Sequence, residues 1–276
     1  MATLEYETGY DAYRPIVEFV QKNGAPRSPR NLPTLDAGVN TIVLHSPFDP
    51  LPLDQGRGLN LAIAAAEALQ LVGGFSEPEM MFKISSQFRQ YARDDGNFHG
   101  AYGTRIKDQV ACAIQKLQHD PASRQAVITL WDPWLDNLPY QKDYPCTIGM
   151  NLALSDAGEL ELNVMMRSSD VWLGLPYDIF QFTQLQLTAA RVMAVPPGQF
   201  TLTTLSLHLY ERDLPGTEQL HSPSRPAYFN AYQPSGLGNP GDIMHTVQDR
   251  ARRLAQLTDH TESEEWYYDR LKPYLS

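Results

Sequence analysis

Residues 143–178 read DYPCTIGMNLALSDAGELELNVMMRSSDVWLGLPYD, and this stretch carries the strongest fold signal in the chain. Two apolar segments, residues 147–154 and 160–166, are joined by the turn-forming sequence Ser-Asp-Ala-Gly, which is typical of a β-hairpin. An apolar segment at 178–193 follows, and it predicts a helix that stops before two consecutive prolines. The stretch therefore predicts a hairpin, a polar loop and a helix, in that order.

The elements around this stretch mix helices and strands without regular strand–helix–strand alternation. Helices are expected at residues 12–22, 59–72, 78–93, 104–118 and 242–257, and strands at 39–44, 126–131 and 200–210. Residues 213–241 are interpreted as a proline-rich loop. This pattern favours an α+β fold with a mixed β-sheet flanked by helices over a doubly wound sheet. A length of 276 residues is compatible with one such domain, so we expect residues 1–276 to form a single domain.

The composition excludes several classes of protein. Hydrophobic residues make up 42% of the chain and charged residues 20%, values typical of globular rather than disordered proteins. The formal net charge is −10 and no long run of Lys or Arg occurs, so a protein that grips nucleic acid through its phosphates is not expected. A small anionic ligand is still compatible, because a few arginines suffice to hold one.

The expected compartment is the cytoplasm. The chain begins without the charged and apolar regions of a signal peptide, and its two cysteines, Cys112 and Cys146, cannot form a disulfide framework. The most apolar long segment, residues 59–75, contains polar side chains and is shorter than the roughly 20 residues that a membrane span needs. No membrane association is therefore expected.

Common cofactor and metal motifs do not occur in the sequence. The seven histidines are scattered singly, and no His-Glu-x-x-His, Walker or Cys-x-x-Cys motif is found, so no metal site is predicted. One Gly-x-Gly-x-x-Gly match begins at Gly236, but it follows no clear strand and contains a proline. We interpret it as a flexible loop rather than as a dinucleotide-binding site.

A thiol and a cation in the stretch 143–178 are the first indication of chemistry. Cys146 follows a proline where a loop enters a strand, and Arg167 stands at a strand end beside Ser168 and Asp170. Taken singly, Cys146 is compatible with a small buried apolar residue and Arg167 with a structural ion pair. Taken together they indicate a reactive thiolate, because a nearby guanidinium favours the ionised form of a thiol.

Several motifs in order give a more specific resemblance. The chain has Pro-Cys at 145–146, Arg-Ser-x-Asp-Val-x-Leu-Gly-Leu-Pro at 167–176 and His-Leu-Tyr at 208–210. Upstream segments also fit, and they contain Arg30 with Thr34, Glu67 with Gly74, Tyr102 with Gly103, and Ser123 with Arg124. With these motifs the chain resembles the thymidylate synthase family over about residues 25–215, while residues 216–276 match poorly.

The resemblance implies a thymidylate synthase-like catalytic domain that dimerises through its sheet and acts on a pyrimidine nucleoside monophosphate. Cys146 would add to C6 of the ring, which makes C5 nucleophilic enough to attack the one-carbon unit of 5,10-methylenetetrahydrofolate. Glu67 would organise water for proton transfer, and Tyr102 would assist removal of the C5 proton. Without the resemblance, Glu67 is also compatible with a solvated helix position and Tyr102 with a core aromatic.

The resemblance also implies how the nucleotide and the folate are held. Arg30, Arg167 and Ser168 would bind the phosphate, since guanidinium groups suit its oxygens. Arg124 would reach the same phosphate from a second subunit, which makes the protein an obligate homodimer; the family often has a second Arg next, where this chain has Gln125. His208 and Tyr210 would hydrogen-bond the sugar. The expected folate-binding residues are Phe88, Tyr91, Asp170, Leu173 and Gly174.

Two departures from the family pattern point to the base. Enzymes of this family that use dUMP have Asn where this chain has Asp178, and His where it has Thr147. A protonated Asp can donate to N3 of cytosine and accept from its N4 amino group, whereas a carboxylate would face O4 of uracil with like polarity. Asp178 therefore predicts a cytidylate. Thr147 and Met166 make the chain resemble phage deoxycytidylate hydroxymethylases more than ordinary thymidylate synthases.

Three further departures predict the product. Methylating members shield the site from water with a Trp, a Leu and an apolar C-terminal lid, where this chain has Phe88, Asp143 and the end sequence Leu271–Ser276. All three changes favour entry of water, which would give a hydroxymethyl group, and Asp143 is a candidate to position that water. We therefore expect a cytidylate 5-hydroxymethylase. The alternatives are a methylase of dCMP or dUMP and an inactive nucleotide-binding homologue, and ribose is not distinguished from deoxyribose.

Overall fold

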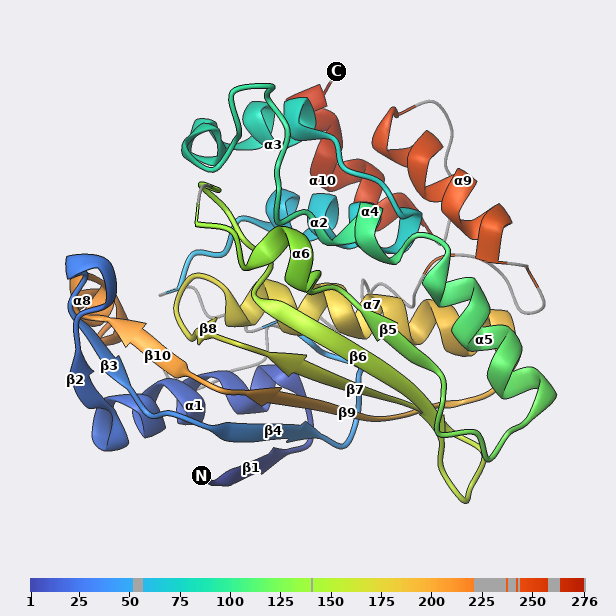
Figure 1. Cartoon of the computed structure of the whole chain (residues 1–276), viewed down its shortest axis with the longest axis horizontal. Helices are drawn as coiled ribbons and strands as arrows, with labels where there is room; N and C mark the ends of the chain where they lie inside the picture. Colours follow the sequence, from blue (N-terminus) through green and yellow to red (C-terminus); the bar gives the residue numbers. More distant parts are fainter. Residues whose placement is uncertain are drawn as a thin grey trace.

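A six-stranded mixed sheet forms one side of the molecule (Figure 1). Across the sheet the strands are β1 (Thr3–Tyr6), β4 (Asn40–Leu44), β9 (Pro197–Thr204), β7 (Leu160–Met166), β6 (Thr147–Leu154) and β5 (Val127–Thr129). β1 runs parallel to β4 and β7 parallel to β9, and the other neighbours are antiparallel. The predicted hairpin and the predicted mixed sheet are confirmed. The computed structural model describes residues 1–51, 57–139, 141–220, 237, 242, 244–257 and 264–275.

A second, smaller sheet stands beside the first. It consists of β2 (Ala25–Arg27), β3 (Thr34–Asp36), β10 (Leu207–Tyr210) and β8 (Ser169–Asp170). The prediction of one strand over 200–210 was wrong, because the chain leaves the large sheet after Thr204 and pairs with β3 and β8 instead. Apolar residues alternate on both sides of this bend, at 200 and 202 and then at 205, 207 and 209, and only the adjacent Thr203 and Thr204 mark the change of phase. The bend places β10 next to the residues that follow β7.

Helices cover one face of the large sheet in successive layers (Figure 1). α7 (Leu175–Met193) packs on β7 and β9, α2 (Leu61–Gly73) packs on α7, and α9 (Met244–Ala255) and α10 (Glu265–Leu275) pack on α2. α1 (Gly9–Asn23) packs on β1 and β10, and α5 (Gln109–His119) on β5 and β6. Because α7 is enclosed between sheet and helices, nearly all of its side chains are buried.

Short helices complete the structure, and two of the expected helices are divided. The expected helix 78–93 is α3 (Pro78–Ile84) followed by a 3₁₀ turn, Ser86–Gln90, since Ser85 takes an extended conformation. The expected helix 104–118 is α4 (Tyr102–Ile106) and then α5. The remaining short helices are α6 (Pro133–Asp136) and α8 (Leu214–Thr217), the latter inside the expected loop 213–241. Most of that loop, and the glycine match apart from Leu237, lie outside the described residues.

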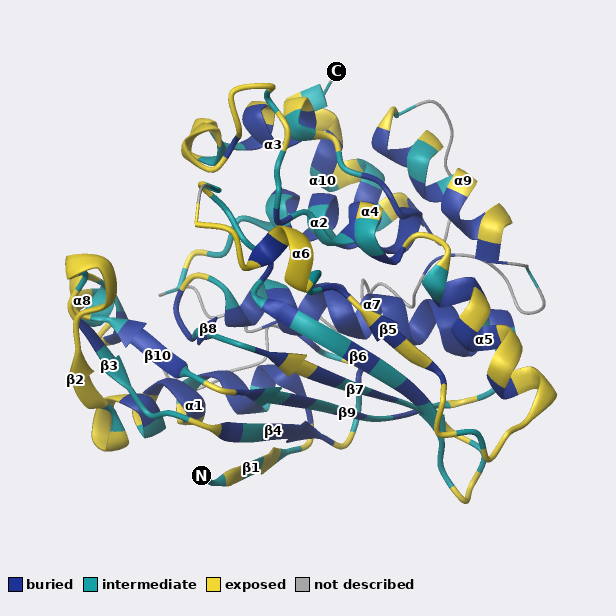
Figure 2. Ribbon diagram, in the orientation of Figure 1, coloured by how far each residue is buried: buried dark blue, intermediate teal, exposed yellow. Residues whose placement is uncertain are grey.

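Strict alternation gives the large sheet two different faces (Figure 2). Leu162, Val164 and Leu202 face the helices and are buried, and Val164 lies opposite Leu202 in the register of β7 and β9. On the other face, Val127 is 57% exposed and Met165 47% exposed. No described helix packs over this second face in Figure 1. A sheet with one uncovered and partly apolar face is available for contact with another molecule.

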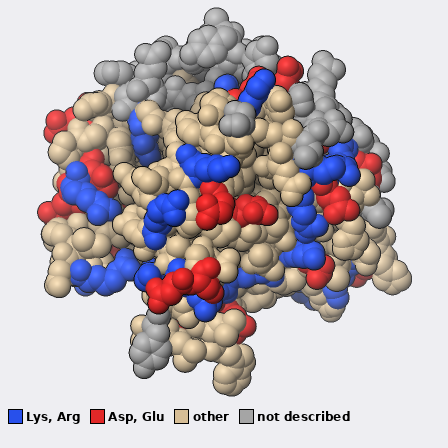
Figure 3. Space-filling model, turned by 90° about the horizontal axis from the view of Figure 1, so that it is seen from above, with Lys and Arg blue, Asp and Glu red and all other residues tan. Residues whose placement is uncertain are grey.

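The surface charge, and the length and apolar character of the helices, bear on possible partners. On the face shown in Figure 3, Lys and Arg side chains are interspersed with Asp and Glu, and they form no continuous basic surface there. Among the described helices, none combines the length and the apolar character that crossing a bilayer requires.

The helical side of the core provides a test of the fold. Leu117 on α5 is fully buried, and its neighbour Gln118 is exposed. We expect Leu117→Ala to lower the free energy of unfolding by about 2–5 kcal/mol, because the substitution leaves a cavity in a packed core. Gln118→Ala, the matched control, should change it by less than about 0.5 kcal/mol. Urea denaturation followed by circular dichroism measures both; equal effects of the two substitutions would contradict this packing.

Candidate active site

Two cavities meet at Tyr144, which lines both of them. The first has a volume of about 360 Å³ and is lined by residues from α2, α4, α7 and the segment before β6, including Glu67, Tyr102, Asp143, Cys146 and Asp178. The second has a volume of about 660 Å³ and is lined by Arg30, Arg167, Ser168, His208 and Tyr210, among others. The structure therefore brings together most of the residues that the sequence predicted for the site.

Cys146 is held by the backbone at the start of β6 and by Arg167. The Arg167 N–H donates to the Cys146 carbonyl at 2.8 Å, and its guanidinium donates to the Pro145 carbonyl at 3.0 Å. One guanidinium nitrogen lies 3.7 Å from the Cys146 Sγ. Burial raises the pKa of the Cys146 thiol to about 11, an effect that Arg167 opposes and that the carboxyls of Asp178 and Asp143 reinforce. The thiol is thus mainly protonated near neutral pH, and Arg167 is placed to stabilise the thiolate.

Two carboxyl groups share the first cavity. Asp178, in the first turn of α7, is only 9% exposed and accepts a hydrogen bond on Oδ1 from Gln181 Nε2 at 3.1 Å. Burial raises the pKa of Asp178 to about 7, against the lowering effect of that hydrogen bond. Burial and the nearby Asp178 raise the pKa of Glu67, on α2, to about 8. Both carboxyls are therefore able to gain and lose a proton near neutral pH.

Aromatic groups and a buried hydroxyl border these carboxyls. Tyr102 begins α4 and stacks on Phe182 of α7, with ring centroids 6.0 Å apart and planes inclined by 12°. Burial raises the pKa of Tyr102 well above its ordinary value, and the charges of Asp178 and Cys146 add to this. Thr147 is fully buried and lines neither cavity. Tyr102 is thus positioned as a neutral hydroxyl beside the thiol.

The second cavity combines arginines with groups suited to a sugar. Arg30 is exposed and has a φ of 52°, in the left-handed region that non-glycine residues seldom adopt. Ser168 Oγ lies 3.4 Å from His208 Nδ1, and the His208 ring stands nearly perpendicular to that of Tyr210 at 5.2 Å. Arginines beside hydroxyl and imidazole groups are suited to a phosphorylated sugar.

Four of the five expected folate-binding residues line the first cavity, and the fifth, Asp170, does not. Phe88, Tyr91, Leu173 and Gly174 line the first cavity, and Leu173 is 44% exposed. Asp170 lines neither cavity; its Oδ1 accepts from the Trp172 N–H at 2.9 Å. Aromatic and apolar side chains around an opening of this size fit a flat heteroaromatic ring such as a pterin.

Arg124 lies apart from the other predicted site residues. It is exposed in the connection between α5 and β5 and lines neither cavity. Val127 is paired with Asn151, far along β6 from Cys146, so Arg124 is at the opposite end of the sheet from the thiol. Within one chain, Arg124 does not contribute to this site.

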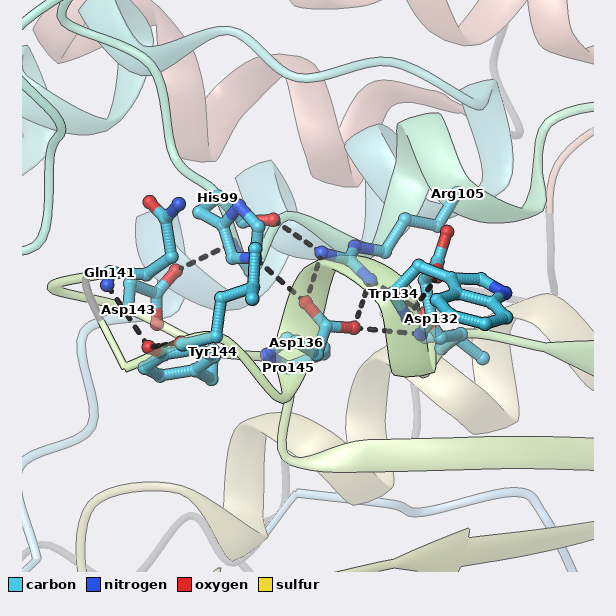
Figure 4. Close-up of polar contacts among 12 residues, drawn as sticks. His99, Arg105, Asp132, Trp134, Asp136, Gln141, Asp143, Tyr144 and Pro145 are labelled. Carbon is cyan, nitrogen blue, oxygen red and sulfur yellow. Dashed lines mark hydrogen bonds and ion pairs between the residues drawn. The ribbon is translucent and has the colours of Figure 1, made fainter.

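Sequence reasoning missed several residues of the site. Gln181 lies three residues after Asp178 on the same helix face, and this spacing could have identified it. Asp136, Arg105 and His99 form a buried polar cluster beside Asp143 and Tyr144, shown in Figure 4. Asp136 is more than 30 residues from His99 and Arg105 in the sequence, so no local pattern indicated the cluster. No group of three or more His, Cys, Asp or Glu side chains able to hold a metal ion occurs among the described residues.

Comparison with known proteins agrees with this site. A family model described as thymidylate synthase matches residues 12–229. The chain is 27% identical over 218 residues to a deoxyuridylate hydroxymethyltransferase of Bacillus phage SP01, covering 73% of this chain and 57% of the relative. It is 28% identical over 199 residues to a deoxyuridylate hydroxymethyltransferase of Pseudomonas phage M6, covering 69% and 56%. A thymidylate synthase of Clostridium beijerinckii is 33% identical over 132 residues, covering 46% and 48%. The chain thus spans about half the length of the curated relatives it matches.

The buried thiol gives a testable pH dependence. We expect alkylation of Cys146 by iodoacetamide in the unliganded protein to have its midpoint well above pH 8.5, the ordinary value for cysteine, because burial disfavours the thiolate. Arg167→Gln should shift the midpoint further upward, since it removes the neighbouring cation. A Cys112→Ser background restricts the signal to Cys146, and mass spectrometry follows the adduct. A midpoint below pH 8 would show that the thiol is not held as described.

Proposed function

The chain belongs to the thymidylate synthase family, and we propose that it transfers a one-carbon unit from 5,10-methylenetetrahydrofolate to C5 of a pyrimidine nucleoside monophosphate. The observation that carries the proposal is the cavity in which Cys146, Glu67, Tyr102 and Asp178 meet, next to a second cavity lined by arginines. Nucleoside monophosphates and folates are cytoplasmic metabolites, and we propose that the protein acts there.

The reaction begins with bond formation between Cys146 Sγ and C6 of the pyrimidine. Arg167 stabilises the thiolate that attacks, and it lines the second cavity, where it and Arg30 bind the phosphate. C5 forms a bond to the one-carbon unit of the folate, the C5 proton is lost, and tetrahydrofolate leaves as its C–N bond to that carbon breaks, so an exocyclic CH₂ remains on C5. Phe88, Tyr91 and Leu173 line the cavity that would hold the folate ring. Tyr102 assists removal of the C5 proton, and Glu67, with its raised pKa, relays protons through water.

We propose that water, rather than hydride, completes the reaction. The oxygen of water bonds to the exocyclic CH₂ on C5, its proton passes to Asp143, and the displaced electron pair re-forms the C5–C6 double bond as Cys146 leaves C6. Asp143 supports this step because it lines the same cavity as the thiol and accepts from the Gly100 N–H at 3.0 Å. The two phage relatives named as hydroxymethyltransferases support the same product.

We propose a cytidylate, CMP or dCMP, as the nucleotide. Asp178 is half protonated near pH 7, and its Oδ1 already accepts from Gln181. In its acid form it donates to N3 of cytosine and accepts from the N4 amino group. N3 of cytosine is a basic ring nitrogen and can share that proton, which strengthens the hydrogen bond.

A uridylate is the second candidate, because both phage relatives are named for deoxyuridylate. The acid form of Asp178 can also donate to O4 of uracil and accept from its N3–H. However, O4 is a weakly basic carbonyl, and the ionised carboxylate would face it with like polarity. The buried site of Asp178 therefore favours cytosine over uracil.

Assay of CMP, dCMP, dUMP and UMP with the folate, read by mass spectrometry, tests substrate and product together. We expect the cytidylates to gain CH₂O, and we expect Asp178→Asn to reduce their turnover by about 10²-fold or more while raising that of the uridylates, since an amide matches the uracil edge. Gain of a methyl group with formation of dihydrofolate would instead identify a methylase.

Two outcomes of this assay separate the remaining possibilities. Cys146→Ser should abolish turnover while nucleotide binding, measured by calorimetry, is retained. Binding of nucleotides without turnover in the unaltered protein would identify an inactive homologue, and equal turnover of uridylates and cytidylates would contradict the role of Asp178.

We propose that the protein is a homodimer joined through the uncovered sheet face. Val127 and Met165 supply exposed apolar surface there, and Arg124, remote from its own cavity, would reach the partner's second cavity. The position of Arg124 outside both cavities of its own chain supports such a shared site.

Subunit mixing tests this arrangement. We expect Arg124→Ala and Cys146→Ser homodimers each to be inactive or weakly active, and mixtures of the two to recover activity. In a mixed dimer, one cavity has an intact thiol and receives an intact Arg124 from the other subunit. Val127→Glu should dissociate the dimer in analytical ultracentrifugation, because it places a charge in a desolvated interface. Absence of recovery on mixing, with dimers present, would exclude a shared site.

A further inference from the structure

A fully enclosed carboxylate joins three segments next to the active site (Figure 4). The Asp136 side chain, at the end of α6, has no exposed surface. Its Oδ1 lies 2.7 Å from His99 Nε2 and 2.9 Å from Arg105 Nη2, and its Oδ2 lies 2.6 Å from Arg105 Nη1 and accepts from the Asp132 N–H at 2.8 Å. Burial acts to raise the pKa of Asp136, but these hydrogen bonds together hold it below its ordinary value. Asp136 is therefore a carboxylate with four hydrogen bonds.

The cluster determines the backbone position of the segment before α4. Arg105 Nη2 donates to the His99 carbonyl at 2.8 Å, while Arg105 Nη1 donates to the Leu130 carbonyl at 2.7 Å. Residue 99 is thus held by its side chain through Asp136 and by its carbonyl through Arg105. The position of the next peptide N–H, that of Gly100, follows from these two restraints.

That N–H is directed at Asp143. It donates to Asp143 Oδ2 at 3.0 Å, whereas Oδ1 accepts no hydrogen bond from the described residues. The approach requires glycine, because a Cβ at position 100 would lie 2.5 Å from Asp143 Oδ2. His99 also contacts Tyr144, with ring centroids 5.7 Å apart in an edge-on arrangement. Asp143 and Tyr144, the two residues before Pro145, are therefore both restrained by the segment 99–100.

We propose that Asp136, His99 and Arg105 form a positioning cluster for Asp143, which holds the carboxylate in the orientation that accepts the proton of the attacking water. This inference rests on the proposed function, in which Asp143 is the base for hydroxymethylation. His99 and Arg105 line neither cavity, and Asp136, which borders the second cavity, has no exposed side-chain surface. They act through the Gly100 N–H and the Tyr144 ring.

The charged groups around Asp143 give the proposal a pH signature. His99 and Arg105 face it from the segment before α4 and from α4, Arg167 from the end of β7, and Cys146 and Tyr91 across the cavity. Burial raises the pKa of Asp143, and the Gly100 N–H, His99 and the two arginines oppose this. Loss of His99 should therefore raise the Asp143 pKa and move the acid limb of hydroxymethylation to higher pH.

The experiment compares two steps of the reaction in His99→Ala. Release of tritium from C5 of the nucleotide reports thiol addition and proton removal, and formation of the hydroxymethyl nucleotide reports the step that uses Asp143. We expect product formation to fall by about tenfold to hundredfold, an effect of misplacing a reacting group. Tritium release should stay within about threefold. The acid limb should shift upward, and adding Asp143→Asn should cause no further loss, because both substitutions remove the same function.

Controls separate positioning from folding. His45→Ala, which removes an exposed histidine far from the cavities along the sequence, should leave both steps unchanged. His99→Gln can still donate to Asp136 and should restore most of the product formation; it also serves if His99→Ala does not fold, as judged by thermal denaturation. Equal loss of tritium release and product, or an unmoved acid limb, would overturn the positioning role alone. Absence of hydroxymethyl product from the unaltered protein would overturn the proposed function, and this inference with it.

Discussion

Removal of water from around ionisable groups is the constraint on which the site depends. Cys146, Asp178 and Glu67 lie against one cavity between α2, α4 and α7, and burial is the largest influence on the pKa of each. Near pH 7, burial keeps the Cys146 thiol and Glu67 mainly protonated and leaves Asp178 about half protonated. Arg167 is the cation within 3.7 Å of the Cys146 Sγ, and it also lines the second cavity. In the proposed reaction, nucleotide binding and activation of the thiol are therefore connected through one side chain.

The sheet supplies the geometry that this chemistry needs. β6 and β7 form the hairpin predicted from the sequence, and their register places Thr147 opposite Met166, so Cys146 and Arg167 are adjacent where the two strands meet the cavity. The bend after Thr204 then directs β10 alongside β8, which adds His208 to the phosphate end. Within this frame the Asp136 cluster restrains the segment 99–100 against Asp143. The rigid sheet holds the nucleophile, and a separate polar cluster holds the proposed base.

Much of the fold followed from periodicity, and the failures have clear causes. The hairpin and α7 were predicted nearly to their ends, because strict alternation and a continuous apolar run are local properties. The expectation of one strand over 200–210 is wrong because apolar residues alternate on both sides of the bend. The phase change at Thr203–Thr204 is a weak local signal, and pairing with β3 and β8 defines the second strand. The strand β1 and the helix α10 were missed: β1 is four residues long, and α10 contains a proline.

The sequence by itself determined the pairing of strands 147–154 and 160–166 in a hairpin, and it predicted Cys146 with Arg167 and the departures at Asp178 and Asp143, because these depend on residue type and on local order. Only the tertiary structure decided which groups share a cavity. It placed Gln181 on Asp178, separated Arg124 from the site of its own chain, and brought Asp136 to His99 and Arg105, which are more than 30 residues away in the sequence. The physical reason is that burial and hydrogen bonding between remote segments set proton affinities, and neither exists until the chain is packed.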